Sequence, residues 1–305
     1  MNYTSLHIAL PVFNESQTIP QLFRRLDDVI RKDLSGYDCR VIAVDDGSSD
    51  DSFEQMVSLK EKYGWLTILR FTRNFGHHIA ILAALDHCDA DIVAIMDSDL
   101  QDPPEELPKL VASLSSDTPL VYAIRKCYHT SASRRIASAW FWNRINRWSG
   151  LDMPLNQAMM RVFTKKVHLA ITLCREHNRF TGGLFAYTGF RYTCVEIESR
   201  AREYGTSQYS LHKMVSMGLN ALLGYSYTPA SWLFKIGIFA MALAIFAFPT
   251  FAFFFFPKLS NFIIPFIIAA LGMLFCGLGS VLYVQLHILA EAKKRPLYFI
   301  ESIIE

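Results

Sequence analysis

The residues best suited to chemistry in this sequence are two aspartates that follow an apolar run. Residues 92–96 are apolar, Asp97 and Asp99 come directly after them, and Gln101 follows. Because side chains alternate along an extended chain, Asp97 and Asp99 should point to the same side. Carboxylate and amide oxygens suit Mg²⁺ or Mn²⁺, which often bridge carboxylates to a phosphate. The spacing therefore predicts a metal site for a pyrophosphate, with a turn or helix cap as the alternative.

Two earlier apolar runs also end in polar residues. Asn14 and Glu15 follow the first run, and the segment DDGSSD at residues 45–50 follows the second. No GxGxxG follows the first run, which argues against a dinucleotide site, and the absence of GxxxxGK[ST] excludes a P-loop. Turns would explain any one of these segments, but their occurrence at the ends of three apolar runs favours a nucleotide held by carboxylates and a metal ion.

The elements that must position these residues follow from hydrophobic periodicity. Apolar runs predict strands at residues 6–12, 39–45, 66–71, 91–97 and 119–124. Apolar residues at helical spacing predict helices at residues 18–32, 51–63 and 76–88. Nearly continuous apolar strands that alternate with helices indicate an α/β fold with a mainly parallel, Rossmann-like sheet covered on both faces. Ligands of such sheets bind beyond the carboxyl ends of the strands, where the polar segments lie.

Composition separates a mixed N-terminal part from an apolar C-terminal part. The chain has 305 residues and a net charge of +2, which argues against a nucleic-acid-binding surface. We expect no signal peptide, because no basic stretch precedes a long apolar run near residue 1. The six scattered cysteines favour a reduced compartment. Hydrophobic residues make up 51% of the chain, and residues 231–290 hold most of the excess.

The apolar C-terminal part predicts a pair of membrane-spanning helices. Residues 236–256 and 262–284 contain no charge, and each run is long enough to cross about 30 Å of hydrocarbon. Lysines and arginines before and after the pair place the large domain and both termini in the cytoplasm. The alternative for such a run is a buried core helix.

We therefore predict four segments along the chain. They are a cytoplasmic domain at residues 1–205, an amphipathic interfacial segment at 206–230, a transmembrane pair within 231–290 (helices at about 233–256 and 262–286), and a cytoplasmic tail at 291–305. The alternative for the amphipathic segment is a helix that packs on the large domain.

Four segments of the sequence resemble motifs of one family. LPVFNE, VDDGSSD, TRNFGH and MDSDLQDPPEELPKL are similar to motifs of the family 2 glycosyltransferases with the GT-A fold. The DLQ-PPE continuation most resembles the polyisoprenyl-phosphate glycosyltransferases, which include dolichol-phosphate mannose synthases and bacterial undecaprenyl-phosphate (bactoprenol) glucosyl- and aminoarabinosyl-transferases. This resemblance implies two sets of residues. The nucleotide-binding residues would be Pro11, Asn14, Glu15, Asp46 and Ser98, and the metal ligands would be Asp97, Asp99 and Gln101.

The resemblance also implies an acceptor that carries a phosphate. Arg125 follows the fifth predicted strand, at the position of a family arginine that meets phosphate, and we assign it with Asp97 and Asp99 to catalysis. Arg134 and Arg161 are the other candidates for the acceptor phosphate. The alternative for each arginine is a solvated surface charge.

One segment departs from the family pattern. Many relatives carry D-x-G-D-F-R where this chain has NQAMMR at residues 156–161, so Asn156 and Met159 replace acids. The second of these acids is a candidate catalytic base in the relatives. A phosphate monoester with a second pKa of about 6 is already mostly a dianion at neutral pH, so we expect no need for that base. Asn156 and Gln157 are predicted to contact sugar hydroxyls instead.

These expectations define one reaction and two alternatives. The resemblance implies inverting transfer of a single hexose from a UDP-linked donor to undecaprenyl phosphate, at the cytoplasmic face of the bacterial inner membrane. The enzyme would use Mg²⁺ or Mn²⁺, form a homo-oligomer such as a tetramer, and supply a lipid-linked sugar for modification of an envelope glycan. An inactive membrane scaffold that binds nucleotide sugar is the first alternative. A processive polysaccharide synthase is disfavoured, because residues 144–148 read RINRW rather than QxxRW.

Overall fold

The computed structural model describes residues 3–126, 132–176, 180–199, 225, 231–232, 235–239 and 260–305. The chain divides into two compact units, and each is described by itself. Unit 1 comprises Met1–Tyr225 and Leu297–Glu305, and unit 2 comprises Ser226–Pro296.

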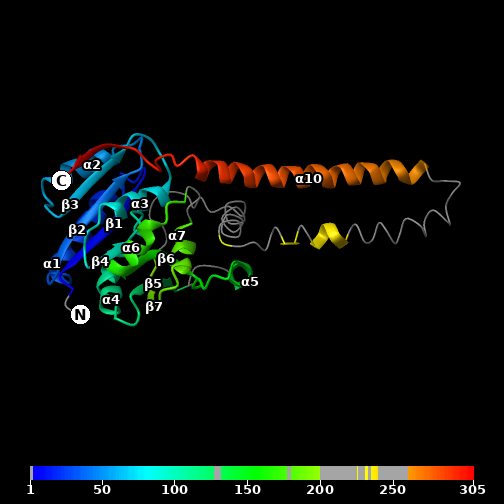
Figure 1. Cartoon of the computed structure of the whole chain (residues 1–305). Helices are drawn as coiled ribbons and strands as arrows, with labels where there is room; N and C mark the ends of the chain where they lie inside the picture. Colours follow the sequence, from blue (N-terminus) through cyan, green and yellow to red (C-terminus); the bar gives the residue numbers. More distant parts are fainter. Residues whose placement is uncertain are drawn as a thin grey trace. The chain divides into compact units, whose positions relative to one another are not determined.

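Unit 1 is built on one eight-stranded sheet with the order β7-β5-β6-β4-β1-β2-β3-β8 (Figure 1). The pairs β1–β2, β1–β4, β2–β3 and β5–β7 are parallel, whereas β6 runs antiparallel to both β4 and β5. The strands are β1 (Ser5–Val12), β2 (Asp38–Asp45), β3 (Leu66–Phe71), β4 (Ile92–Ile95), β5 (Leu120–Arg125), β6 (Gln157–Thr164), β7 (Tyr192–Ile197) and β8 (Ile300–Ile304). The predicted mainly parallel sheet is confirmed, and the antiparallel β6 between β4 and β5 is new.

Helices cover both faces of this sheet, as the sequence pattern predicts. On one face, Leu22 and Phe23 of α1 pack with Ile8 of β1. On the other face, Ile81 of α3 and Val167 of α6 pack with alternate strand residues. A first and a second core thus lie on the two faces, because side chains alternate between the faces of a sheet. A smaller cluster surrounds Ile145, Leu151 and Met153. The helices of unit 1 are α1 (Ile19–Lys32), α2 (Ser52–Lys60), α3 (His77–Asp86), the short 3₁₀ turn η1 (Pro104–Glu106), α4 (Leu107–Ala112), α5 (Ala132–Ser149), α6 (Lys165–Leu173) and α7 (Thr181–Tyr187).

The end of the chain belongs to this sheet. Residues 291–305 are predicted as a tail, but the structure places Ile300–Ile304 as β8, antiparallel to β3 at the sheet edge (Figure 1). Ile304 pairs with Ile68, and Ile303 pairs with Leu69. The sequence distance between β3 and β8 explains why local pattern analysis missed this pairing.

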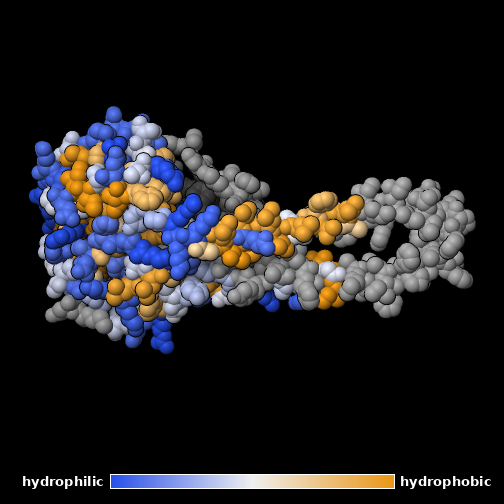
Figure 2. All heavy atoms as spheres, turned by 45° about the horizontal axis from the view of Figure 1, so that its top comes forward, coloured by the Kyte–Doolittle hydropathy of each residue, from blue (hydrophilic) through white to orange (hydrophobic). Residues whose placement is uncertain are grey.

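Unit 2 contains the long helix α10 (Ser260–Ala292). The second predicted membrane segment, at about 262–286, lies within this helix. Most of the first one, at about 233–256, and most of the interfacial segment at 206–230 fall outside the described residues. Among the residues that the structure describes, no helix meets the length and hydropathy required to cross a bilayer. Figure 2 shows apolar side chains along the described part of α10, and several are exposed: Leu274, Phe275, Leu278, Val281 and Leu282.

Candidate active site

The acidic pair lies just beyond the carboxyl end of β4. The side chain of Asp97 is 20% exposed, and His77 Nε2, from the first turn of α3, lies 3.3 Å from Asp97 Oδ1. Burial favours a higher pKa for Asp97, but His77 and then Arg125 outweigh it, and the net pKa is lowered. The same contact raises the pKa of His77, although burial opposes the rise. Asp97 is therefore an ionised group that contacts His77 and lies in the field of Arg125.

Asp99 also takes part in a local turn. Asp99 Oδ1 accepts a hydrogen bond from the backbone N–H of Gln101 at 3.1 Å. Leu100, between them, has a φ of 59°, which bends the chain sharply after the strand. Asp99 and Ser98 are both buried. The turn geometry that was the alternative interpretation is thus present, and it leaves the predicted metal role of these residues untested.

Arg125 is fixed beside the acidic pair by a residue that sequence reasoning did not assign. Its Nε donates to Asp102 Oδ1 at 2.8 Å, and its Nη2 donates to Asp102 Oδ2 at 2.9 Å. Asp102 is completely buried, and Arg125 is 33% exposed. Burial opposes charge on Arg125, but Asp102, Asp97 and Asp99 together raise its pKa. The only signal for Asp102 in the sequence was a further acid directly after Gln101.

Arg161 lies in a different environment. It sits on β6, is 1% exposed, and donates to Met159 O at 3.1 Å and to Ala158 O at 3.2 Å. The rings of Tyr122 and Phe185 lie 5.3 and 4.8 Å from its guanidinium carbon. Burial lowers the pKa of Arg161. The arginine predicted for the acceptor phosphate is therefore enclosed in the second core, and its contact with a phosphate stays a prediction.

The predicted sugar residues lie next to Arg125. Asn156 O accepts the backbone N–H of Arg125 at 3.1 Å, and Gln157 pairs with Ile124 across β5 and β6. This proximity arises because β6 inserts between β4 and β5. Arg134 lies in the first turn of α5, and its side chain falls outside the described residues.

Hydrogen bonds of the predicted nucleotide residues connect the loop after β1 to the loop after β2. Asn14 Oδ1 accepts the backbone N–H of Ser49 at 2.8 Å, and the backbone N–H of Asn14 donates to Ser48 Oγ at 3.0 Å. The backbone N–H of Glu15 donates to Ser52 Oγ at 2.8 Å. Pro11 is buried within β1. The two loops therefore form one hydrogen-bonded surface beyond the carboxyl ends of β1 and β2.

Asp46 joins this surface to the loop before α3. Its carboxylate accepts the backbone N–H of Phe75 at 2.7 Å and that of Gly76 at 3.0 Å, and it is 2% exposed. The next residue, Gly47, has a φ of 69°, and a Cβ there would lie 2.6 Å from the carbonyl carbon of Arg73. Only glycine fits this close approach. The predicted role of Asp46 in nucleotide binding stays a prediction, because both of its oxygens already accept backbone hydrogen bonds.

The chemistry of the acidic pair fits a divalent cation. No group of three or more His, Cys, Asp or Glu side chains suited to a metal ion occurs in the described part of the chain. The predicted set contains only two such residues, Asp97 and Asp99, with the amide of Gln101 as third ligand. Asp97 Oδ1 is buried and accepts no hydrogen bond from the described residues. An ionised oxygen with only an ion-pair contact suits a hard cation such as Mg²⁺ or Mn²⁺.

Comparisons with known proteins agree with the sequence motifs. The family described as glycosyl transferase family 2 matches residues 7–172. An undecaprenyl-phosphate 4-deoxy-4-formamido-L-arabinose transferase from Sodalis glossinidius is 30% identical over 321 residues, covering 100% of this chain and 95% of that protein. The uncharacterised glycosyltransferase YkcC from Bacillus subtilis is 28% identical over 314 residues, covering 97% of this chain and 93% of that protein.

One solved structure with a TM-score above 0.5 shares the fold at low sequence identity. A mycobacterial protein is 18% identical, with a TM-score of 0.52 over 73% of this chain and 75% of that chain. A mannosyltransferase from Pyrobaculum calidifontis, solved with GDP-Man and Mn²⁺, is 17% identical, with a TM-score of 0.49 over 80% and 81% of the two chains. The resemblance seen in the motifs is confirmed: this chain is a glycosyltransferase with the GT-A fold and belongs to glycosyl transferase family 2.

Proposed function

We propose that this enzyme transfers one hexose from a UDP-linked donor to undecaprenyl phosphate, with inversion at the anomeric carbon. The observation that carries this proposal is the Arg125–Asp102 pair, which fixes a partly exposed guanidinium beside Asp97 and Asp99. Such a group can receive the phosphate of an acceptor next to the site of a donor diphosphate. The similarity of the whole chain to an undecaprenyl-phosphate sugar transferase supports the same acceptor.

Different residues of this chain have different roles in the proposed reaction. Asp97, Asp99 and Gln101 would hold Mg²⁺ or Mn²⁺, which neutralises the leaving diphosphate. Arg125 orients the acceptor phosphate so that one of its oxygens bonds to C1 of the sugar, while the bond from C1 to the diphosphate oxygen breaks. Arg134 and Arg161 are proposed to assist with the acceptor, and Asn156 and Gln157 to contact the sugar. A phosphate with a second pKa of about 6 is mostly a dianion at pH 7, so no side-chain base is required.

We place the reaction at the cytoplasmic face of the bacterial inner membrane. The exposed apolar side chains of α10 support contact with lipid, because moving residues such as Phe275 and Leu282 out of water lowers the free energy. The proposed arrangement is a domain at residues 1–205, an interfacial segment at 206–230, two membrane helices within 231–290, and a cytoplasmic chain end. We also propose a homo-oligomer, since the glycines of α10, including Gly272 and Gly277, permit close helix contact.

A donor and acceptor panel tests this function. The full-length protein in mild detergent is incubated with undecaprenyl phosphate, Mg²⁺ or Mn²⁺, and a set of UDP- and GDP-sugars. We expect one lipid-linked monosaccharide, with a rate that falls as the pH drops below about 6, where the acceptor phosphate gains a proton. Binding of nucleotide sugar without any product would identify a scaffold instead, and a product with several sugars would identify a processive synthase.

A further inference from the structure

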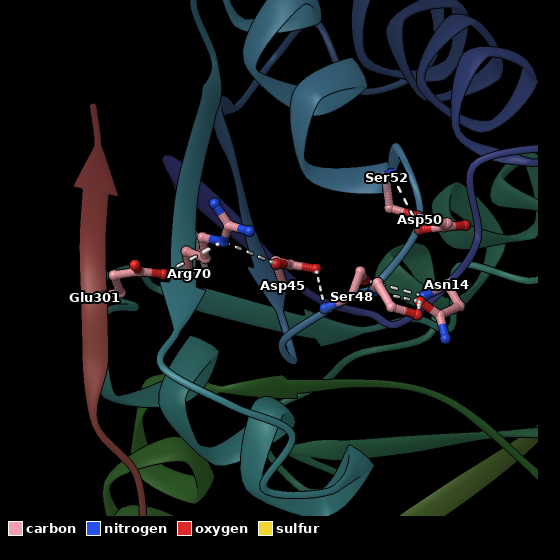
Figure 3. Close-up of polar contacts among 8 residues, drawn as sticks. Asn14, Asp45, Ser48, Asp50, Ser52, Arg70 and Glu301 are labelled. Carbon is pink, nitrogen blue, oxygen red and sulfur yellow. Dashed lines mark hydrogen bonds and ion pairs between the residues drawn. The ribbon is translucent and has the colours of Figure 1, made fainter.

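A series of polar contacts connects β8 to the loop after β2. Glu301 Oε2 of β8 lies 3.4 Å from Arg70 Nε of β3, and the same nitrogen lies 3.7 Å from Asp45 Oδ2 at the end of β2. Figure 3 shows the three side chains in line across the neighbouring strands. Arg70 therefore lies between two carboxylates that come from opposite ends of the sequence.

The position of Glu301 results from an irregularity in β8. Arg70 pairs with Ser302, but its neighbour Phe71 pairs with Ile300, so Glu301 is an extra residue between two paired positions. Such a β-bulge redirects the side chain of the extra residue, and bulges are frequent next to active sites. Here the bulge brings the Glu301 carboxylate to Arg70.

Arg70 is the cation that faces a deeply buried acid. Asp45 is fully buried, and its Oδ2 accepts no hydrogen bond from the described residues. Burial raises the pKa of Asp45, and both the hydrogen bond from Ser48 and the charge of Arg70 oppose that rise. The guanidinium of Arg70 also stacks on the ring of Phe53 in α2, 4.2 Å from its centre. Arg70 thus joins β3, β8, β2 and α2 at one point.

Asp45 also contacts the loops that are predicted to bind the nucleotide. Its Oδ1 accepts the backbone N–H of Ser48 at 3.2 Å, and Ser48 Oγ accepts the backbone N–H of Asn14 (Figure 3). Asn14 is one of the residues proposed to bind the nucleotide. Its φ of 53° lies in the left-handed region, which asparagine adopts more readily than most residues, and the contacts with Ser48 and Ser49 help to hold it there.

A second set of contacts leads from the chain end to the neighbouring acid. Phe299 O accepts the backbone N–H of Thr72 at 3.1 Å, and the rings of Phe299 and Phe75 lie 6.2 Å apart. Phe75 in turn donates its backbone N–H to Asp46. The segment before and within β8 therefore contacts the partners of both Asp45 and Asp46.

We propose that Arg70 is a positioning residue for the donor nucleotide, and that it couples β8 to the loops that carry Asn14 and Asp46. This role rests on the proposed function, since it concerns the same donor site. It predicts that donor affinity depends on the ion pair between Glu301 of β8 and Arg70, although neither residue belongs to the set predicted to bind the nucleotide.

The test measures UDP binding and kinetics in full-length variants. We expect Arg70→Gln to weaken UDP–Mn²⁺ binding about tenfold, as loss of the cation beside a buried acid would. Glu301→Gln should weaken it by about threefold or less, because Glu301 is 56% exposed and its ion pair is partly screened. Both variants should raise the KM for the donor and leave the KM for undecaprenyl phosphate unchanged. Arg70→Lys should recover part of the affinity.

Two matched substitutions control for charge alone. Arg40 is exposed on β2, and Glu305 is exposed after β8, so Arg40→Gln and Glu305→Gln should keep wild-type UDP affinity. If Arg70→Gln lowers the unfolding temperature but binds UDP as the wild type does, the positioning role is wrong. Equal losses in the control variants would also overturn it. Failure of the wild type to bind UDP or GDP would instead refute the proposed function, so the two failures are distinguishable.

Discussion

The strand ends on either side of β1 hold their carboxylates in different ways. After β2, Asp45 and Asp46 accept hydrogen bonds from backbone amides, which fixes the shape of the loops. After β4, Asp97 and Asp102 face the side chains of His77 and Arg125. A hydrogen bond to a backbone amide shifts only when the loop itself shifts, whereas a side-chain ion pair can change partners by a change of rotamer. The first region is therefore suited to a fixed shape, and the second to chemistry.

The largest effect is expected in the second region. Asp99→Ala should reduce transfer by about 10³-fold or more, because one lost carboxylate leaves the diphosphate poorly neutralised. Asp97→Ala should also reduce the transfer rate strongly. Gln101→Ala should reduce it less, since a neutral amide interacts more weakly with a cation than a carboxylate does. Initial rates with radiolabelled donor measure the loss. A wild-type rate in the Asp99 variant would show that this carboxylate is not needed for the reaction. The proposed difference between the two regions would then be wrong.

In the first region, the expected loss is in stability. Gly47→Ala should lower the free energy of unfolding by about 2–4 kcal/mol, because φ is positive there and the new Cβ would meet the backbone of Arg73. Urea unfolding, monitored by tryptophan fluorescence, measures this free energy. Gly64→Ala is the matched control, since a Cβ at Gly64 has no neighbour within 4 Å. Equal stability of the two variants would show that the loops are not tightly fixed.

Asp102 tests whether orientation alone matters beside the acidic pair. Asp102→Asn keeps the shape but loses the carboxylate that holds Arg125 in two hydrogen bonds. We expect kcat to fall about tenfold, as loss of a charge-assisted pair would give, with UDP affinity nearly unchanged. Titration calorimetry with UDP and steady-state kinetics separate these quantities. A loss of UDP binding with unchanged kcat would assign Arg125 to the donor instead of the acceptor.

The smallest effect concerns the missing acid. Met159 Sδ lies 3.8 Å from Arg161 Nη2, so Met159→Asp would bring a carboxylate to a buried guanidinium. We expect the transfer rate to stay within about threefold of wild type, because the acceptor dianion needs no general base. Rates at several pH values above 6 measure this. A large gain in rate would mean that the acid performs catalysis in relatives and is lacking here.

The sequence predicts the parallel half of this fold well and the rest less well. The strands β1 to β5 and the helices α1 to α3 follow from local hydrophobic patterns, and each lies within a few residues of its expected range. β6 was missed because Arg161 interrupts its apolar pattern, although the aromatic rings around the guanidinium allow it to be buried. β8 was missed because its partner β3 is distant in sequence, and local periodicity carries no information about such pairing.

The candidate site was likewise predicted only where local sequence patterns are informative. The acids at the strand ends were found because their types and spacing point to metal and phosphate chemistry. Asp102 was missed because its importance depends on Arg125, which lies on β5 and is brought near it only by the fold. His77 gained its contact with Asp97 only through the packing of α3 against the sheet. Pairings of this kind depend on tertiary geometry, which no motif states.

The pairing of β8 with β3 also bears on how the catalytic unit can be handled. A sheet edge with free N–H and C=O groups invites pairing with another molecule, and β8 occupies that edge on β3. A shortened protein that stops at residue 225, designed to avoid the apolar C-terminal part, would leave β3 uncovered. We expect such a protein to self-associate through this strand, and a version that joins residues 297–305 back to unit 1 through a flexible linker to stay dispersed.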